Sequence, residues 1–282
     1  MTVQIEFPEL IKVPMELPLY AVTPPGWTPD KLAEMARRFD LKGECCDAGA
    51  WFVTRGDAWT LEVYQASHSL RLERNDYDAE ARDGKGGVPD RERAMAVASR
   101  FMQAAGDTMA KPVFDSVTEL RMLKATRENL EGEARVVGLQ VNYRYALGDL
   151  PLVGPGAKAQ VSVGPDGELA QAYRFAREVK RVGVLKTTPL REAFDRFAAS
   201  DHFADLPRGA KARVTSVELG LLCLPPTEVQ GLLAPTYVLR GEVSTELQPR
   251  YEFIAYVAAA ELDEADTKRR RFPQGRPSLL SA

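Results

Sequence analysis

The sequence predicts a soluble α+β protein in which antiparallel sheets are each covered by an amphipathic helix, in a helix-then-meander unit that occurs three times. Two observations predict this class. Three segments carry apolar residues at helical spacing, and each is followed by segments in which apolar and polar residues alternate. A one-sided helix must bury its apolar stripe, and a sheet of alternating residues has one face to cover. We therefore expect each helix to cover the sheet formed directly downstream.

Each predicted helix has four apolar residues at the i, i+3, i+4, i+7 spacing that places them on one face. The first helix follows Thr28 and Pro29, the second follows Pro89, and the third follows Thr188 and Pro189. Proline is tolerated in a first helical turn, and both threonines are placed to cap exposed amides. The three stripes are Leu32, Met35, Ala36 and Phe39; Ala94, Val97, Ala98 and Phe101; and Leu190, Ala193, Phe194 and Phe197.

Alternating or β-branched and aromatic segments predict strands after each helix. A Gly-Pro-Asp-Gly turn at 164–167 indicates a hairpin between two of them, because glycine supplies the positive φ that such turns need. We divide the chain into an N-terminal α+β unit (1–82), two further helix-then-meander units (88–182 and 183–262) and a disordered tail (263–282) with a basic run at 268–271.

Each of these two further units contains a stretch that carries a family resemblance. Tyr143 opens the run YRYALGDLPLVG, and AQVSVGPDGEL follows from Ala159. This pattern resembles PepSY-like modules, including the propeptide (FTP-type) module of thermolysin and fungalysin proteases. The later segments VELGLL from Val217 and LAPTYVLRGEV from Leu233 resemble the end of bacterial two-domain PepSY-like proteins, among them accessory regulators of cell-wall-sensing histidine kinases. The resemblance implies a helix packed on an antiparallel sheet and a non-enzymatic inhibitory, chaperone-like or regulatory role.

Composition and charge argue against several kinds of partner and cofactor. A formal net charge of -3 gives no field that would attract nucleic acid. Two histidines, no Cys-x-x-Cys pair and no carboxylates at ligand spacing predict neither a metal nor a cofactor. The adjacent Cys45 and Cys46 and the distant Cys223 do not form a disulfide framework, and we expect buried or half-buried thiols.

The N-terminal sequence has no basic start followed by an apolar run, which is the pattern of a signal peptide. No apolar stretch approaches the ~18–20 residues that a membrane span needs. As given, the sequence therefore predicts a cytoplasmic protein without a membrane span. A leader removed from the sequence would make the protein secreted or periplasmic instead.

Candidate catalytic chemistry is sparse. Glu218 lies in an otherwise apolar stretch, either on an open sheet face or buried with a raised pKa. His68 and His202 are the only histidines, and their serine and aspartate neighbours are poorly placed for a triad, so we expect surface histidines. If the chain is an enzyme, Glu218 with Tyr143 and Tyr145 is the first candidate set.

Four tyrosines are candidates for binding, although core packing is the ordinary role of an aromatic residue in a strand. These are Tyr143, Tyr145, Tyr173 and Tyr237. The favoured hypothesis is a non-catalytic binding or regulatory module that recognises a protein or peptide through a sheet surface or edge. One alternative is a cofactor-independent enzyme of cyclase or isomerase type, with a pocket for a small apolar molecule between sheet and helices. Another is a structural subunit that oligomerises through a sheet edge.

Overall fold

The computed structural model describes residues 4–76, 87–124, 133–203, 209–245 and 251–262. Half of these residues lie in strands and 16% in helices. The strands form one mixed, 15-stranded sheet. The predicted α+β class with repeated, helix-covered PepSY-like units is therefore wrong, and the protein is dominated by a single large sheet. The predicted tail at 263–282 lies outside the described residues.

The described strands and helices follow one another along the chain. They are β1 (Gln4–Glu6), β2 (Glu16–Val22), α1 (Pro29–Arg37), β3 (Cys45–Asp47), β4 (Trp51–Arg55), β5 (Trp59–Tyr64), β6 (Leu70–Arg74), α3 (Arg91–Ala105), β7 (Lys111–Lys124), β8 (Glu133–Leu147), β9 (Leu150–Val153), β10 (Lys158–Val163), β11 (Leu169–Phe175), β12 (Val179–Lys186), α4 (Leu190–Ala198), a short 3-10 helix (Asp201–Phe203), β13 (Lys211–Leu222), β14 (Leu232–Ser244) and β15 (Tyr251–Ala258).

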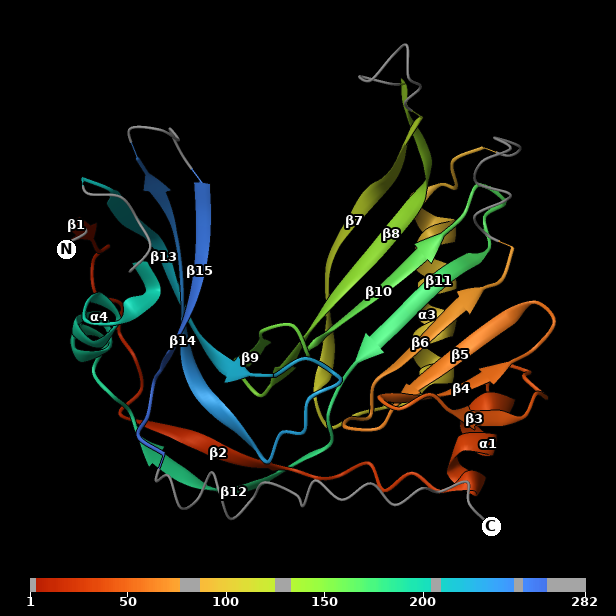
Figure 1. Ribbon diagram of the computed structural model, residues 1–282, viewed down its shortest axis with the longest axis horizontal. Coiled ribbons are helices and arrows are strands. Elements are labelled where there is room, and N and C mark those ends of the chain that lie inside the picture. The colour runs from red at the N-terminus through yellow and green to blue at the C-terminus, as the bar shows by residue number, and fades with distance from the viewer. Residues whose placement is uncertain (1–3, 77–86, 125–132, 204–208, 246–250, 263–282) are drawn as a thin grey trace.

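The sheet has two halves, which Figure 1 shows on either side of an open space. In the first half, β7, β8, β10, β11, β6, β5, β4 and β3 lie side by side in that order. The second half contains β13, β14 and β15, with β1 beside β13. Strand β9 joins the halves, because it pairs with β8 on one side and runs parallel to β13 on the other. Strands β2 and β12 form a ribbon that extends the sheet from β14.

The helices explain why the predicted repeat fails. The three predicted stripes are buried at Leu32, Val97 and Phe194, so each helix forms and covers something as expected. However, α1 and α3 share one hydrophobic core over the first half instead of covering a sheet each. Helix α4 covers one face of the second half through aromatic contacts such as Phe197 against Phe253. Two helices on one sheet cannot form two independent units.

The sequence named Thr28 and Thr188 as caps, and the structure confirms the first and not the second; the cap of α3, Asp90, was not named from the sequence. The Thr28 hydroxyl oxygen accepts a hydrogen bond from the Lys31 amide at 3.4 Å, and Asp90 caps α3 by accepting one from the Arg93 amide at 2.7 Å. Thr188 does not cap α4, whose N-cap is Pro189 without a side-chain bond. The predicted cap is wrong because the Thr188 amide donates to the carbonyl of Ala259 in the second half.

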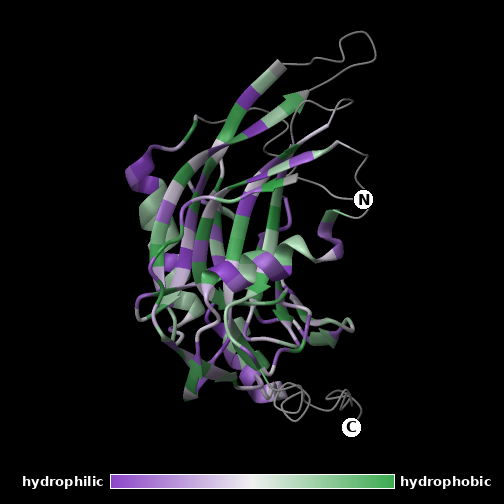
Figure 2. Ribbon diagram, turned by 90° about the vertical axis from the view of Figure 1, so that its left-hand side faces the viewer, coloured by the Kyte–Doolittle hydropathy of each residue, from purple (hydrophilic) through white to green (hydrophobic). Residues whose placement is uncertain are grey.

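Polar and apolar side chains alternate along the strands, as Figure 2 shows. In β11, for example, buried and half-buried residues alternate over all seven positions. One face of the first half therefore packs against α3 and the opposite face carries polar side chains. Among the described residues, no helix has both the length and the hydropathy needed to cross a membrane.

Candidate functional site

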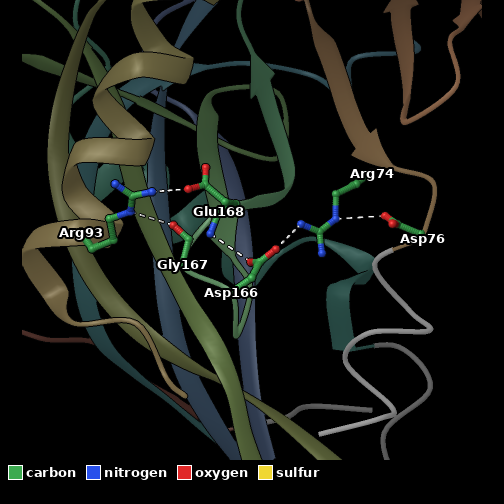
Figure 3. Close-up of polar contacts among 6 residues, drawn as sticks. All are labelled: Arg74, Asp76, Arg93, Asp166, Gly167 and Glu168. Carbon is green, nitrogen blue, oxygen red and sulfur yellow. Dashed lines mark hydrogen bonds and ion pairs between the residues drawn. The ribbon is translucent and has the colours of Figure 1, made fainter. Parts of the chain in front are cut away.

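A chain of charged contacts joins the start of α3 to the turn between β10 and β11 (Figure 3). Arg93 donates to the carbonyl of Gly167 at 2.9 Å and pairs with Glu168. Arg74, at the end of β6, pairs with Asp166 at 2.5 Å. Burial alone would raise the pKa of Asp166, but hydrogen bonds from the Glu168 amide and Arg74 outweigh it and lower that pKa. Because these charges neutralise one another, the cluster fastens α3 to the sheet and offers no free group for chemistry.

The structure does not bring the candidate catalytic residues together. Glu218 lies half-buried on β13, on the face opposite α4, where Arg240 donates to its carboxylate at 2.9 Å. Tyr143 and Tyr145 lie on β8 and face α3. Tyr145 is buried, and burial raises its pKa to about 12. Among the described residues, no hydrogen bond or ion pair connects Glu218 with either tyrosine.

The other two candidate tyrosines differ in exposure. Tyr237 is buried beneath α4, and its hydroxyl donates to the carbonyl of Thr188 at 2.8 Å. Tyr173 lies half-buried on β11, on the face opposite α3. Its ring stacks on that of Phe175 with centroids 4.5 Å apart, and the Lys158 ammonium lies 5.7 Å from its ring centre. Tyr173 is therefore the one candidate tyrosine on the polar face of the first half.

Among the described residues, no side-chain hydrogen bond links either histidine ring to a serine, threonine or cysteine. His68 is half-buried and not a surface residue, and burial together with Arg174 lowers its pKa to about 4. The neighbouring hydroxyls of Ser67 and Ser69 donate to backbone carbonyls. The ring of His202 packs against that of Phe197 at 5.4 Å. Within the described ranges, no three histidine, cysteine, aspartate or glutamate side chains gather as metal ligands do.

Hydrogen-bonded polar side chains cover part of the first half opposite α3, on β7, β8 and β10. We call this set the amide ladder; it consists of Ser116, Thr118, Gln140, Asn142 and Gln160. Asn142 is its centre. The side-chain oxygen of Asn142 accepts from Gln140 at 2.8 Å and from Gln160 at 2.9 Å. Its amide nitrogen donates to Ser116 at 3.2 Å and to Thr118 at 3.3 Å. The ladder therefore holds the polar side chains of β7 in fixed positions beside a sheet edge.

Strand β7 is that edge. Of the described strands it pairs with β8 alone, and its other side borders the open space in Figure 1. Val113, Phe114 and Leu123 are exposed along it. Two register shifts interrupt the pairing with β8, one after Phe114 and one after Leu120. Between the shifts, residues 116–120 keep an unbroken register, so this part of the edge is regular enough to pair with another strand.

Sequence reasoning did not identify the amide ladder, although its signal was present. Gln140 and Asn142 occupy alternate positions of β8, with Val141 between them on the core side. Alternation therefore places both amides on one face. The sequence did not show which strands pair with β8. The pairing with β7 brings Ser116 beside Asn142, and the pairing with β10 brings Gln160 beside it.

Comparisons with known proteins establish a fold and no family. No known family matches the chain, so nothing confirms the resemblance to PepSY-like modules, and no curated protein matches it. An uncharacterized protein from Eubacterium rectale ATCC 33656 is 8% identical, with a TM-score of 0.52 over 93% of this chain and 88% of that chain. YycH from Bacillus subtilis is a more distant structural neighbour, 9% identical, with a TM-score of 0.37 over 66% of this chain and 41% of that chain. The first likeness shows that this arrangement of strands occurs in another protein.

Proposed function

We propose that the chain is a non-catalytic binding protein that holds an extended segment of a partner polypeptide along the free edge of β7. The observation that carries this proposal is a 14-residue edge strand with exposed apolar side chains that no described strand or helix covers. An edge strand presents unpaired N–H and C=O groups, and an extended peptide satisfies them by adding one more strand. The partner segment would pair along the unbroken register at 116–120 and extend past the exposed Phe114 to Val113.

The amide ladder supports the same proposal through its effect on the edge. Ser116 and Thr118 accept hydrogen bonds from Asn142, so their side chains are already ordered before a partner arrives. Ordering a side chain in advance removes part of the entropy cost of binding. A partner strand would place alternate side chains next to these two hydroxyls and the remainder toward the side of Val117. We expect polar residues at the first set of positions and apolar residues at the second.

A selection experiment tests the proposal with a matched pair of variants. Ten-residue peptides are selected from a displayed library on the full chain, and their affinity is compared for Val113→Lys and Val229→Lys. Val113 and Val229 are equally exposed, at 50% and 49%, but Val229 lies in the loop between β13 and β14. A lysine on an edge strand discourages pairing. We expect Val113→Lys to weaken binding at least tenfold and Val229→Lys to leave it unchanged.

Two further measurements locate the peptide. Amide hydrogen exchange should slow within 116–120 when peptide binds, and a peptide with methylated backbone nitrogens should lose its affinity, because strand addition depends on main-chain hydrogen bonds. Protection that falls on β12 or β15 instead, or equal affinity for the two lysine variants, would show that β7 is not the binding edge.

A further inference from the structure

Two buried donors point to a second site, on the core side of the first half and separate from the edge of β7. Arg174 is 4% exposed and Tyr145 is 2% exposed. Arg174 donates from Nη1 to the carbonyl of Gly106 at 2.6 Å and from Nη2 to that of His68 at 3.1 Å. Its Nε–H group and the Tyr145 hydroxyl have no hydrogen-bond partner among the described residues. Unpaired donors at this depth are rare in proteins because each loses its bonds to water without compensation.

The charge of Arg174 is also uncompensated. In the described part of the chain its hydrogen-bond acceptors are backbone carbonyls, and no carboxylate forms an ion pair with it. Glu178 and Asp107 attract it only from a distance. Arg177 adds a second buried guanidinium, which donates to two carbonyls of the loop between β13 and β14. An arginine stays charged when buried, so this region holds two positive charges.

Cys223 does not supply the missing negative charge. It lies close enough to Arg177 for the guanidinium to favour the thiolate, but burial outweighs this effect and raises the pKa of the thiol to about 12. The thiol is therefore neutral near pH 7. His68 is also neutral there and carries no negative charge in any state. Glu228 attracts Arg177 as Glu178 and Asp107 attract Arg174, but among the described residues no carboxylate forms an ion pair with either arginine.

Strand register places the two donors on either side of one small residue. Ala159 pairs with Tyr143 on β8 and with Arg174 on β11, and Tyr145 lies two residues further along β8 on the same face. The side chain between them is the buried methyl group of Ala159. Gly106, which ends α3 with a φ of 83°, contributes its carbonyl above Arg174. Tyr145 therefore lies diagonally across β10 from Arg174, near enough for the guanidinium to favour the ionised form of its hydroxyl.

We propose that a small monovalent anion, chloride or a carboxylate as small as formate, binds between the Arg174 Nε–H group and the Tyr145 hydroxyl. Such an anion accepts a hydrogen bond from each donor and neutralises the guanidinium, as charge-assisted hydrogen bonds do elsewhere in proteins. It would link β8 and β11 to the end of α3 through one ion. The site is independent of the edge of β7, so neither proposal depends on the other.

Thermal unfolding of the full chain tests the proposal at constant ionic strength, with sodium chloride replacing sodium gluconate. Because an anion that binds the folded state alone stabilises it, the unfolding midpoint should rise and saturate with chloride. Tyr145→Phe removes one donor and should raise the half-saturating chloride concentration at least tenfold. If no anion binds, this variant merely removes an unpaired buried hydroxyl, and its stability should equal or exceed that of the parent in both salts.

Tyr237→Phe is the matched control, because it removes a buried tyrosine hydroxyl that has a partner in Thr188. We expect it to lower the midpoint while retaining the chloride response. Crystals grown in bromide should show an anomalous peak within hydrogen-bond distance of Arg174 Nε and Tyr145, and formate should compete for the same position. The absence of that peak, or an identical chloride response in the parent and Tyr145→Phe, would overturn the assignment.

Discussion

At the scale of single residues, His68 links the turn after β5 to the electrostatics of the buried arginines. Its Nδ1 atom accepts a hydrogen bond from the Glu178 amide at 3.3 Å, an arrangement that requires the neutral ring. Burial and the positive charges of Arg174, Lys31 and Arg177 lower its pKa from 6.5 to about 4. Between these two values the unfolded chain binds a proton that the folded protein does not. The resulting stability is present above pH 6.5 and is lost as the pH falls toward 4.

Replacement of His68 by glutamine should remove this part of the pH dependence. Between pH 7 and pH 5 the parent should lose roughly 1–2 kcal/mol more of its free energy of unfolding than His68→Gln does. Chemical denaturation at several pH values measures the difference, in which carboxylates common to both proteins cancel. If the free energy of unfolding depends on pH in the same way for both proteins, the pKa of His68 is not lowered. If the variant loses more stability than the parent, the pKa of His68 is raised instead.

The residues of the candidate site were predictable only in part. Tyr173 was a candidate from the sequence, and the structure places it on the polar face. Tyr145 and Tyr237 are buried, which the sequence did not distinguish, because all three tyrosines occupy strands with similar alternation. Asn142 was not singled out, because an amide in a strand carries no motif. Its importance depends on Ser116 and Gln160, which lie on other strands.

At the scale of elements, the cluster of charged contacts in Figure 3 joins the start of α3 to the turn between β10 and β11. Its two arginines differ in exposure. The Arg74 side chain is 10% exposed, whereas that of Arg93 is 45% exposed. We expect Asp166→Asn, which breaks the pair with Arg74, to cost about 1–2 kcal/mol. Arg93→Gln should cost less than about 1 kcal/mol, and high salt should remove most of its effect. Urea unfolding measures both losses of free energy. Equal losses for Asp166→Asn and Arg93→Gln would show that burial does not determine how much each ion pair contributes to stability.

Elements were predicted better than their arrangement. Each helix was located by four apolar residues within one stripe, and Thr28 correctly marked the cap of α1, because these signals lie within a few residues of sequence. Strand partners depend on distant segments. Val22 of β2 pairs with Val179 of β12, and Leu72 of β6 pairs with Ala172 of β11. Alternation tells which face a residue occupies but not which strand lies beside it, so the single sheet could not be derived from sequence.

At the scale of the whole molecule, contacts at the junction make the two halves one structure. The Ser67 hydroxyl, in the turn after β5, donates to the carbonyl of Pro226 in the loop between β13 and β14 at 2.8 Å. Arg177 Nη2 donates to the carbonyls of Pro225 and Glu228 in the same loop, at 3.0 and 2.7 Å. Strand β9 adds direct pairing to both halves. We therefore expect the halves to unfold together, although each has its own hydrophobic core.

The positions of the tryptophans allow this cooperativity to be measured. Trp27, Trp51 and Trp59 are the three tryptophans of the chain and all belong to the first half, whereas Phe194 is buried in the second. Phe194→Leu should cost about 1–2 kcal/mol by leaving a cavity beneath α4. If the halves unfold as one unit, the tryptophan fluorescence midpoint should fall as far as the midpoint followed by far-ultraviolet circular dichroism. A fluorescence transition that stays in place while the dichroism transition shifts would show two independent domains, because a local cavity affects only the unit that contains it.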